Sequence, residues 1–189
     1  PRGSPPFSKG TCMEQIIILG LGNILYGDEG FGVLLAQRLY AHWDFPENVE
    51  IVDGGTQGQT LLTFVERADR LLVLDAVDFG LEPGELLQRD NVPAYLTAQK
   101  IGPHQNSFSE VMGLAALRGT APDQCTLIGV QPAAMTLAAP LSTPVSERFE
   151  AAQNMALNVL QQWGISPSLR AQPRHLSAAV LDTLAQSYV

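Results

Sequence analysis

Four short apolar runs recur along the chain, and segments with helical periodicity separate them. The runs are β-branched and apolar on both faces, which is typical of strands in a parallel sheet that helices cover on both sides. The alternation of strand and helix therefore predicts an α/β protein in three layers, an α/β/α sandwich. The runs are residues 15–20 (QIIILG), 49–55 (VEIVDGG), 70–76 (RLLVLDA) and 125–131 (CTLIGVQ).

Helical periodicity and start signals place the remaining elements. A short run at 84–89 interrupts the alternation and predicts an antiparallel strand. Thr143 as the N-cap residue and Pro144 at the first helical position predict a last helix. That helix is expected to run to about Trp163 and to end at Gly164. The other predicted helices lie within residues 30–43, 58–68 and 106–119.

The length of 189 residues is about that of one domain. We expect a single domain over residues 13–166, preceded by a non-native or disordered segment, 1–12. This segment begins PRGS, which looks like the remnant of a protease-cleavage site. From 167 to 189 the periodicity is lost, and we expect a tail that can dock on the domain.

The charge and the cysteine content limit the classes of partner. The formal net charge of −8 argues against nucleic acid and against an anionic membrane surface, because both attract basic proteins. The apolar run at 15–20 is too short to span a bilayer. Cys125 is the only cysteine of the predicted domain, which excludes an intramolecular disulfide and fits a reducing compartment. We expect a cytoplasmic protein that is a monomer when free.

A glycine-rich turn, GNILYGDEG at residues 22–30, follows the first strand. Its G-x-x-x-x-G spacing is that of a phosphate-binding loop, but Asp28 and Glu29 stand where such a loop has Lys and Ser or Thr. The dinucleotide-binding fingerprint G-x-G-x-x-G is also absent, because Leu25 stands at the position of its third glycine. Acidic residues in this turn favour the binding of a cation over that of a phosphate group. We assign Asp28 mainly to the start of the following helix, where a carboxylate interacts well with the helix dipole.

Other reactive side chains also follow predicted strand ends, where ligands of parallel sheets collect. Asp53 and Asp75 end two of the strands, and His104 lies in a loop before a helix. Taken singly, each has a simpler interpretation as a turn-forming, capping or solvated residue. Together, Glu29, Asp75 and His104 form a set of two oxygen ligands and one nitrogen ligand. Such a set suits a first-row divalent ion with open positions for water or substrate.

Several motifs agree in type, order and separation with one protein family. The motifs are GLGNILYGDEGFG, VDGGTQG, LLVLDAVD and HQNSFSEV, and the resemblance covers about residues 13–164. The chain resembles the hydrogenase maturation endopeptidases that process the large subunits of nickel–iron hydrogenases, and is similar to the branch that serves membrane-bound uptake hydrogenases. The resemblance implies a twisted, mostly parallel five-stranded sheet between helices.

The resemblance also implies a function and a set of nickel-contacting residues. The expected enzyme removes a C-terminal peptide from the large-subunit precursor after nickel has been inserted. In the family pattern the nickel contacts are the Glu of G-D-E, the Asp that closes the third strand and the His before the helix. In this chain these are Glu29, Asp75 and His104.

We hypothesise that the nickel is supplied by the precursor and orients its scissile bond next to the enzyme. Asp53 is the candidate for a general base, as in an aspartyl-type protease, or for holding the cleavage segment. Two glycines allow another chain to approach closely. We therefore assign Gly54, Gly55 and Thr56 to substrate binding.

Two other classes of function remain open. One is a self-sufficient metallohydrolase with its own zinc or manganese ion, and the other is a non-catalytic nickel-binding maturation chaperone. A covalent mechanism is disfavoured because Cys125 enters a buried strand and no Ser/His/Asp or Cys/His set is recognisable.

Overall fold

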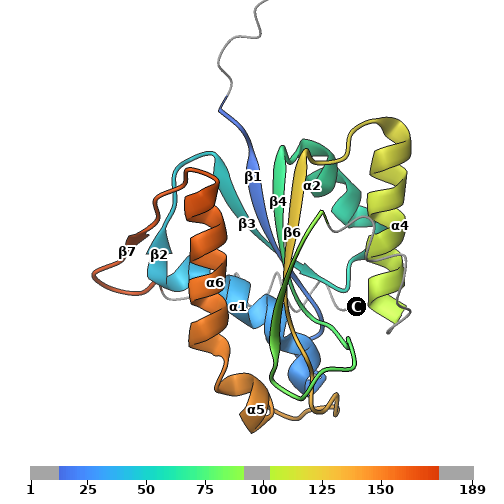
Figure 1. Ribbon diagram of the computed structural model, residues 1–189, viewed down its shortest axis with the longest axis vertical. Helices are drawn as coiled ribbons and strands as arrows, with labels where there is room; N and C mark the ends of the chain where they lie inside the picture. The colour runs from blue at the N-terminus through green and yellow to red at the C-terminus, as the bar shows by residue number, and fades with distance from the viewer. Residues whose placement is uncertain (1–12, 92–102, 175–189) are drawn as a thin grey trace, which may run out of the picture.

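Figure 1 shows a computed structural model of the chain, which describes residues 13–91 and 103–174. A five-stranded sheet with the order β3-β1-β4-β6-β5 forms the middle layer. The first four strands in this order are parallel, and β5 pairs with β6 in the antiparallel sense. The predicted architecture, including the antiparallel strand, is confirmed. The strands are β1 (Ile16–Leu21), β3 (Val49–Gly55), β4 (Arg70–Ala76), β5 (Leu86–Asp90) and β6 (Gln124–Val130).

Helices cover both faces of the sheet (Figure 1). Side chains of α1 and α6 pack in one hydrophobic cluster with the sheet, and side chains of α2 and α4 pack in the other. Two short 3-10 turns, η1 and η2, lead into α1 and α2. The bounds are η1 (Gly27–Gly30), α1 (Phe31–His42), η2 (Gly58–Leu61), α2 (Leu62–Arg67), α4 (Pro103–Arg118) and α6 (Phe149–Gln162).

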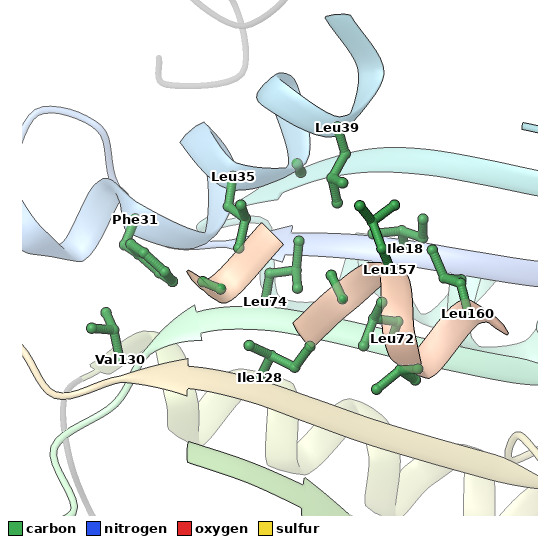
Figure 2. Close-up of a cluster of buried hydrophobic side chains, with 14 of the residues drawn as sticks. Ile18, Phe31, Leu35, Leu39, Leu72, Leu74, Ile128, Val130, Leu157 and Leu160 are labelled. Atoms are coloured by element: carbon green, nitrogen blue, oxygen red, sulfur yellow. The ribbon is translucent and has the colours of Figure 1, made fainter. Parts of the chain in front are cut away.

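The side chains of each strand alternate between the two clusters. In β1, Ile16 and Ile18 face α1 and α6, whereas Ile17, Leu19 and Leu21 face α2 and α4. This division explains why the strand is apolar at every position. Figure 2 shows the cluster on the α1 and α6 side, with labelled side chains Ile18, Phe31, Leu35, Leu39, Leu72, Leu74, Ile128, Val130, Leu157 and Leu160.

The last predicted helix is in fact two helices. A short helix α5 (Thr143–Ser146) precedes α6, and the chain turns at Glu147 and Arg148 between them. The N-cap residue of α5 is Ser142, not Thr143, and its side chain makes no capping hydrogen bond. Its hydroxyl is instead used in a contact with η1, described below. Gly164 ends α6 as predicted, with φ +81°.

The segment after α6 folds back onto the end of α1. A two-residue strand β7 (Ser168–Leu169) pairs with β2 (Trp43–Asp44), so Trp43 belongs to a strand and not to the predicted helix. Arg170 forms an ion pair with Asp44, and the guanidinium of Arg174 lies 4.7 Å from the centre of the Tyr40 ring. The described part of the expected tail is therefore docked. No helix within the described ranges is both long and apolar enough to cross a bilayer.

We predict that Gly32 in α1 is required for the close contact between α1 and the sheet. A Cβ at Gly32 would lie 2.1 Å from the carbonyl oxygen of Leu74 and 2.5 Å from that of Leu21. Gly32→Ala should therefore lower the free energy of unfolding by more than about 2 kcal/mol, since backbone atoms must move. Gly113→Ala in α4 is the matched control, because nothing lies within 4 Å of its Cβ position. The control should gain about 0.5–1 kcal/mol in urea unfolding. Equal stability of the two variants would contradict this account.

Candidate functional site

The candidate site lies at the edge of the sheet toward which β1, β4 and β6 run. Figure 1 shows that α4 begins at this same end of the molecule. Asp75 is the penultimate residue of β4 and is buried, with 6 % of its surface exposed. One carboxylate oxygen of Asp75 accepts a hydrogen bond of 2.8 Å from the backbone N–H of Ala76. Asp75 is two residues from both Val73 and Val77, which belong to the α2 and α4 cluster, so its side chain leaves the sheet on that same face.

Glu29 lies on η1, which packs against β4. The turn that carries it folds back tightly over the end of β1. A Cβ at Gly22, where φ is +118°, would lie only 1.8 Å from the carbonyl oxygen of Glu29. Only glycine fits there, which is the physical reason for the glycine-rich turn. Glu29 and Asp75 thus come from two elements in contact, as the strand-end argument predicts.

His104 is the second residue of α4, and α4 begins at the same end of the sheet (Figure 1). The structure does not describe the side chains of residues 103–107. Among the side chains that it does describe, no group of three or more His, Cys, Asp and Glu residues could hold a metal ion. The set of Glu29, Asp75 and His104 therefore stays a prediction.

Asp53 does not share a face of the sheet with Asp75. Val49, Ile51 and Asp53 are spaced two residues apart in β3 and so point to the same face of the sheet. The side chains of Val49 and Ile51 pack against the α1 and α6 cluster, which identifies that face. The carboxylate of Asp53 accepts hydrogen bonds from Gln37 Nε2 of α1 at 3.4 Å and from the backbone N–H of Gly55 at 3.0 Å. Burial raises the pKa of Asp53 above 3.8, although these two hydrogen bonds by themselves lower it.

The two glycines after Asp53 have different structural causes. Gly54 is buried, and a Cβ there would lie 2.7 Å from Leu19 Cδ1, so a side chain at this position would have to displace a leucine of the core. Gly55 has φ +45°, in the left-handed region, and its carbonyl oxygen accepts a hydrogen bond from the N–H of Gly22. Thr56 follows half-buried in the turn. Contact of these residues with a substrate stays a prediction.

Asp28 has a different role from the one predicted. Its side chain is fully buried and caps no helix; it accepts four hydrogen bonds from the loop between β6 and α5. The donors are Ala133 N at 2.8 Å, Ala134 N at 2.9 Å, Ser142 N at 2.7 Å and Ser142 Oγ at 2.8 Å. Asp28 therefore fixes this loop against the turn that carries Glu29. No local spacing could have shown this role, because the partners are 105–114 residues away in sequence.

Cys125 is excluded as a nucleophile. It is buried at the second position of β6, and burial raises the pKa of its thiol to about 12. A thiol with this pKa holds almost no thiolate, the reactive form, at neutral pH. The prediction that Cys125 lies in a buried strand is confirmed.

We predict that Asp28→Asn destabilises the fold. Both carboxylate oxygens accept from donors, so the NH₂ group of an asparagine must face at least one N–H or O–H donor. An unpaired buried donor costs about 1–3 kcal/mol, and the charge-assisted bonds are lost in addition. Urea unfolding should show a loss of about 2 kcal/mol or more, against less than about 0.5 kcal/mol for Asp123→Asn at an exposed site. An equal and small loss of stability in the two variants would contradict this prediction and show that the loop rearranges around the asparagine.

A second prediction concerns the pH dependence that Asp53 confers. Its pKa is raised on folding, so the folded state holds this proton more tightly than the unfolded state. The contribution of Asp53 to the free energy of unfolding therefore falls as the pH rises from about 3.8 through the raised pKa of the folded state. Asp53→Asn removes this titration, and Gln37 can reverse its amide to accept from the new NH₂ group. The stability of the variant relative to the parent should increase between about pH 4 and pH 7 in urea unfolding. A constant or falling difference would contradict the raised pKa.

Comparisons with known proteins show the family of the chain. Residues 33–159 match the family model described as hydrogenase maturation protease. The chain is 43% identical over 163 residues to the hydrogenase expression/formation protein HupD of Bradyrhizobium diazoefficiens, covering 85% of each chain. It is 36% identical over 154 residues to the hydrogenase 2 maturation protease of Escherichia coli, covering 80% of this chain and 93% of the relative.

A solved structure of this family has the same fold. The hydrogenase maturating endopeptidase HybD from E. coli superposes with a TM-score of 0.80 at 33% sequence identity, covering 83% of this chain and 98% of that chain. The fold thus agrees with the sequence relationship. The chain belongs to the hydrogenase maturation protease family and is a peptidase.

Proposed function

We propose that this peptidase removes the C-terminal peptide of a nickel–iron hydrogenase large-subunit precursor after nickel insertion. In this proposal, Glu29, Asp75 and His104 bind the nickel that the precursor carries. The observation that carries the proposal is the packing of η1 against β4, which brings the two acids to one edge of the sheet. The start of α4, with His104, lies at the same end of the molecule (Figure 1).

The chemistry of these residues suits a metal that arrives with the substrate. Two carboxylates and one imidazole leave positions on a nickel ion for ligands of the precursor. Asp75 is buried, so its attraction to a cation is screened by water less than that of a surface acid. Docking through the metal would also restrict cleavage to precursors that have received nickel, since a metal-free precursor lacks this anchor.

For Asp53, the geometry favours the second of its two expected roles. A raised pKa suits a general base, but the carboxylate faces α1 and leaves the sheet on the side opposite to Asp75. Its hydrogen bond to the N–H of Gly55 stabilises the turn of Gly54, Gly55 and Thr56. We therefore propose that Asp53 holds this turn in position for the cleavage segment.

The test is a processing assay with nickel-loaded precursor and three near-isosteric variants. Glu29→Gln, Asp75→Asn and His104→Gln should each slow the shortening of the precursor by orders of magnitude, because each removes a ligand of one ion. The Glu29→Gln/Asp75→Asn double variant should be little slower than its slower single variant. The readout is the size of the large subunit on a gel, with thermal unfolding of each variant as the measure of folding.

Asp123→Asn is the control and should process at the parental rate, since Asp123 is exposed and lies before β6, away from the site. Normal processing by all three site variants would refute the nickel site. Stoichiometric metal in the purified enzyme, with activity lost to a chelator, would favour the self-sufficient metallohydrolase instead. If the parent protein fails to shorten any nickel-loaded precursor, the proposed substrate is wrong.

A further inference from the structure

Two loops at the rim of the site expose large apolar side chains. The loop from β1 to η1 exposes Leu25 and Tyr26, and the loop from β6 to α5 exposes Met135 and Leu137. Their exposed fractions are 51% and 39% in the first loop and 47% and 62% in the second. We call these four residues the apolar platform. Exposed apolar groups that gather in one place, unlike scattered ones, mark interaction sites.

Backbone contacts place the two loops side by side. The N–H of Ala138 donates to the carbonyl oxygen of Leu25 at 2.7 Å, and the N–H of Asp28 donates to that of Ala134 at 3.1 Å. A Cβ at Gly27 would lie 3.1 Å from the same Ala134 oxygen, so the loops touch along their length. The platform is therefore one surface built from two distant parts of the sequence.

The platform carries no charge, although the protein has a net charge of −8. Residues 131–146 contain no acidic or basic residue, and neither do residues 16–27. The acid that lies between the two loops, Asp28, is fully buried and directs its carboxylate inward. A partner of this surface would therefore be recognised by apolar contact and not by charge.

The second loop is held in one strained conformation. Ala138 has φ +58°, which a residue with a Cβ adopts only when its surroundings impose it. Those surroundings are the four hydrogen bonds to the Asp28 carboxylate and the bond from Ala138 to Leu25. Met135 and Leu137 are thus presented on a fixed backbone. Such preorganisation lowers the entropy cost of binding.

We infer that the apolar platform docks an apolar segment of the precursor polypeptide next to its metal centre. The occupant follows from position: the N–H of Glu29 donates to the carbonyl oxygen of Tyr26 at 3.2 Å, so the platform is continuous with the proposed nickel site. A chain whose nickel lies at Glu29 is therefore within reach of Tyr26. This inference rests on the proposed function and names a second contact of the same substrate.

The test compares two matched double variants in the processing of nickel-loaded precursor. Met135→Gln/Leu137→Gln changes the platform, and Leu117→Gln/Leu169→Gln changes two side chains of α4 and β7 that are 89% and 68% exposed. The platform variant should show an apparent KM raised by about tenfold or more, with kcat within about twofold, because it loses apolar burial on docking. The control variant should keep both constants. Light scattering gives the mass of each free protein.

An unchanged KM in the folded platform variant overturns the inference and leaves the proposed function intact, as does a loss confined to kcat. A parent protein of twice the chain mass that the platform variant reduces to one chain shows a second copy on this surface, which also overturns it. Failure of the parent to cleave the precursor refutes the proposed function and the inference with it. If the double variant does not fold, Leu137→Gln alone is measured in the same way.

Discussion

The carboxylate of Asp28 joins the loop between β6 and α5 to the turn that carries Glu29. A buried charged group is stable only when hydrogen-bond donors surround it. Four donors of the loop between β6 and α5 surround the buried carboxylate of Asp28. Through these bonds the loop is fixed to η1, and η1 is fixed by its contact with β4. The Asp28 carboxylate and the backbone bond from Ala138 to Leu25 therefore hold the two exposed loops together and the strained backbone at Ala138 in place.

Two adjacent acids in one glycine-rich turn thus have separate roles. Asp28 directs its charge into the protein and stabilises a loop, whereas Glu29 lies half-buried at the edge of the sheet. The glycines explain how a turn can carry both, because Gly22 lets the chain reverse within contact of the carbonyl oxygen of Glu29. A phosphate-binding loop has the same spacing for a similar geometric reason, but its charges are opposite.

The sequence predicts the elements well where their cause is local. The bounds of β3 and β4 agree with the predicted runs residue by residue, because an apolar β-branched run between polar residues is a local signal. The role of Asp28 and the division of the last helix were not predictable in this way. Both involve Ser142, whose hydroxyl could cap α5 or bind Asp28, and only the folded chain shows which contact forms. The separation of Asp53 and Asp75 onto opposite faces likewise depends on how β3 and β4 are each aligned with β1.

If the nickel site and the apolar platform act as proposed, the enzyme recognises its substrate by two contacts of different chemistry. Three protein ligands bind a nickel ion incompletely, and a few exposed apolar side chains bind a peptide weakly, so neither contact alone holds a precursor firmly. Joined in one polypeptide, the second contact forms at a high effective concentration, and the two affinities multiply. A precursor with the correct sequence but no nickel, or a nickel complex without the apolar segment, then binds weakly. Because Asp28 fixes the distance between the two contacts, this selectivity depends on the rigidity of the rim.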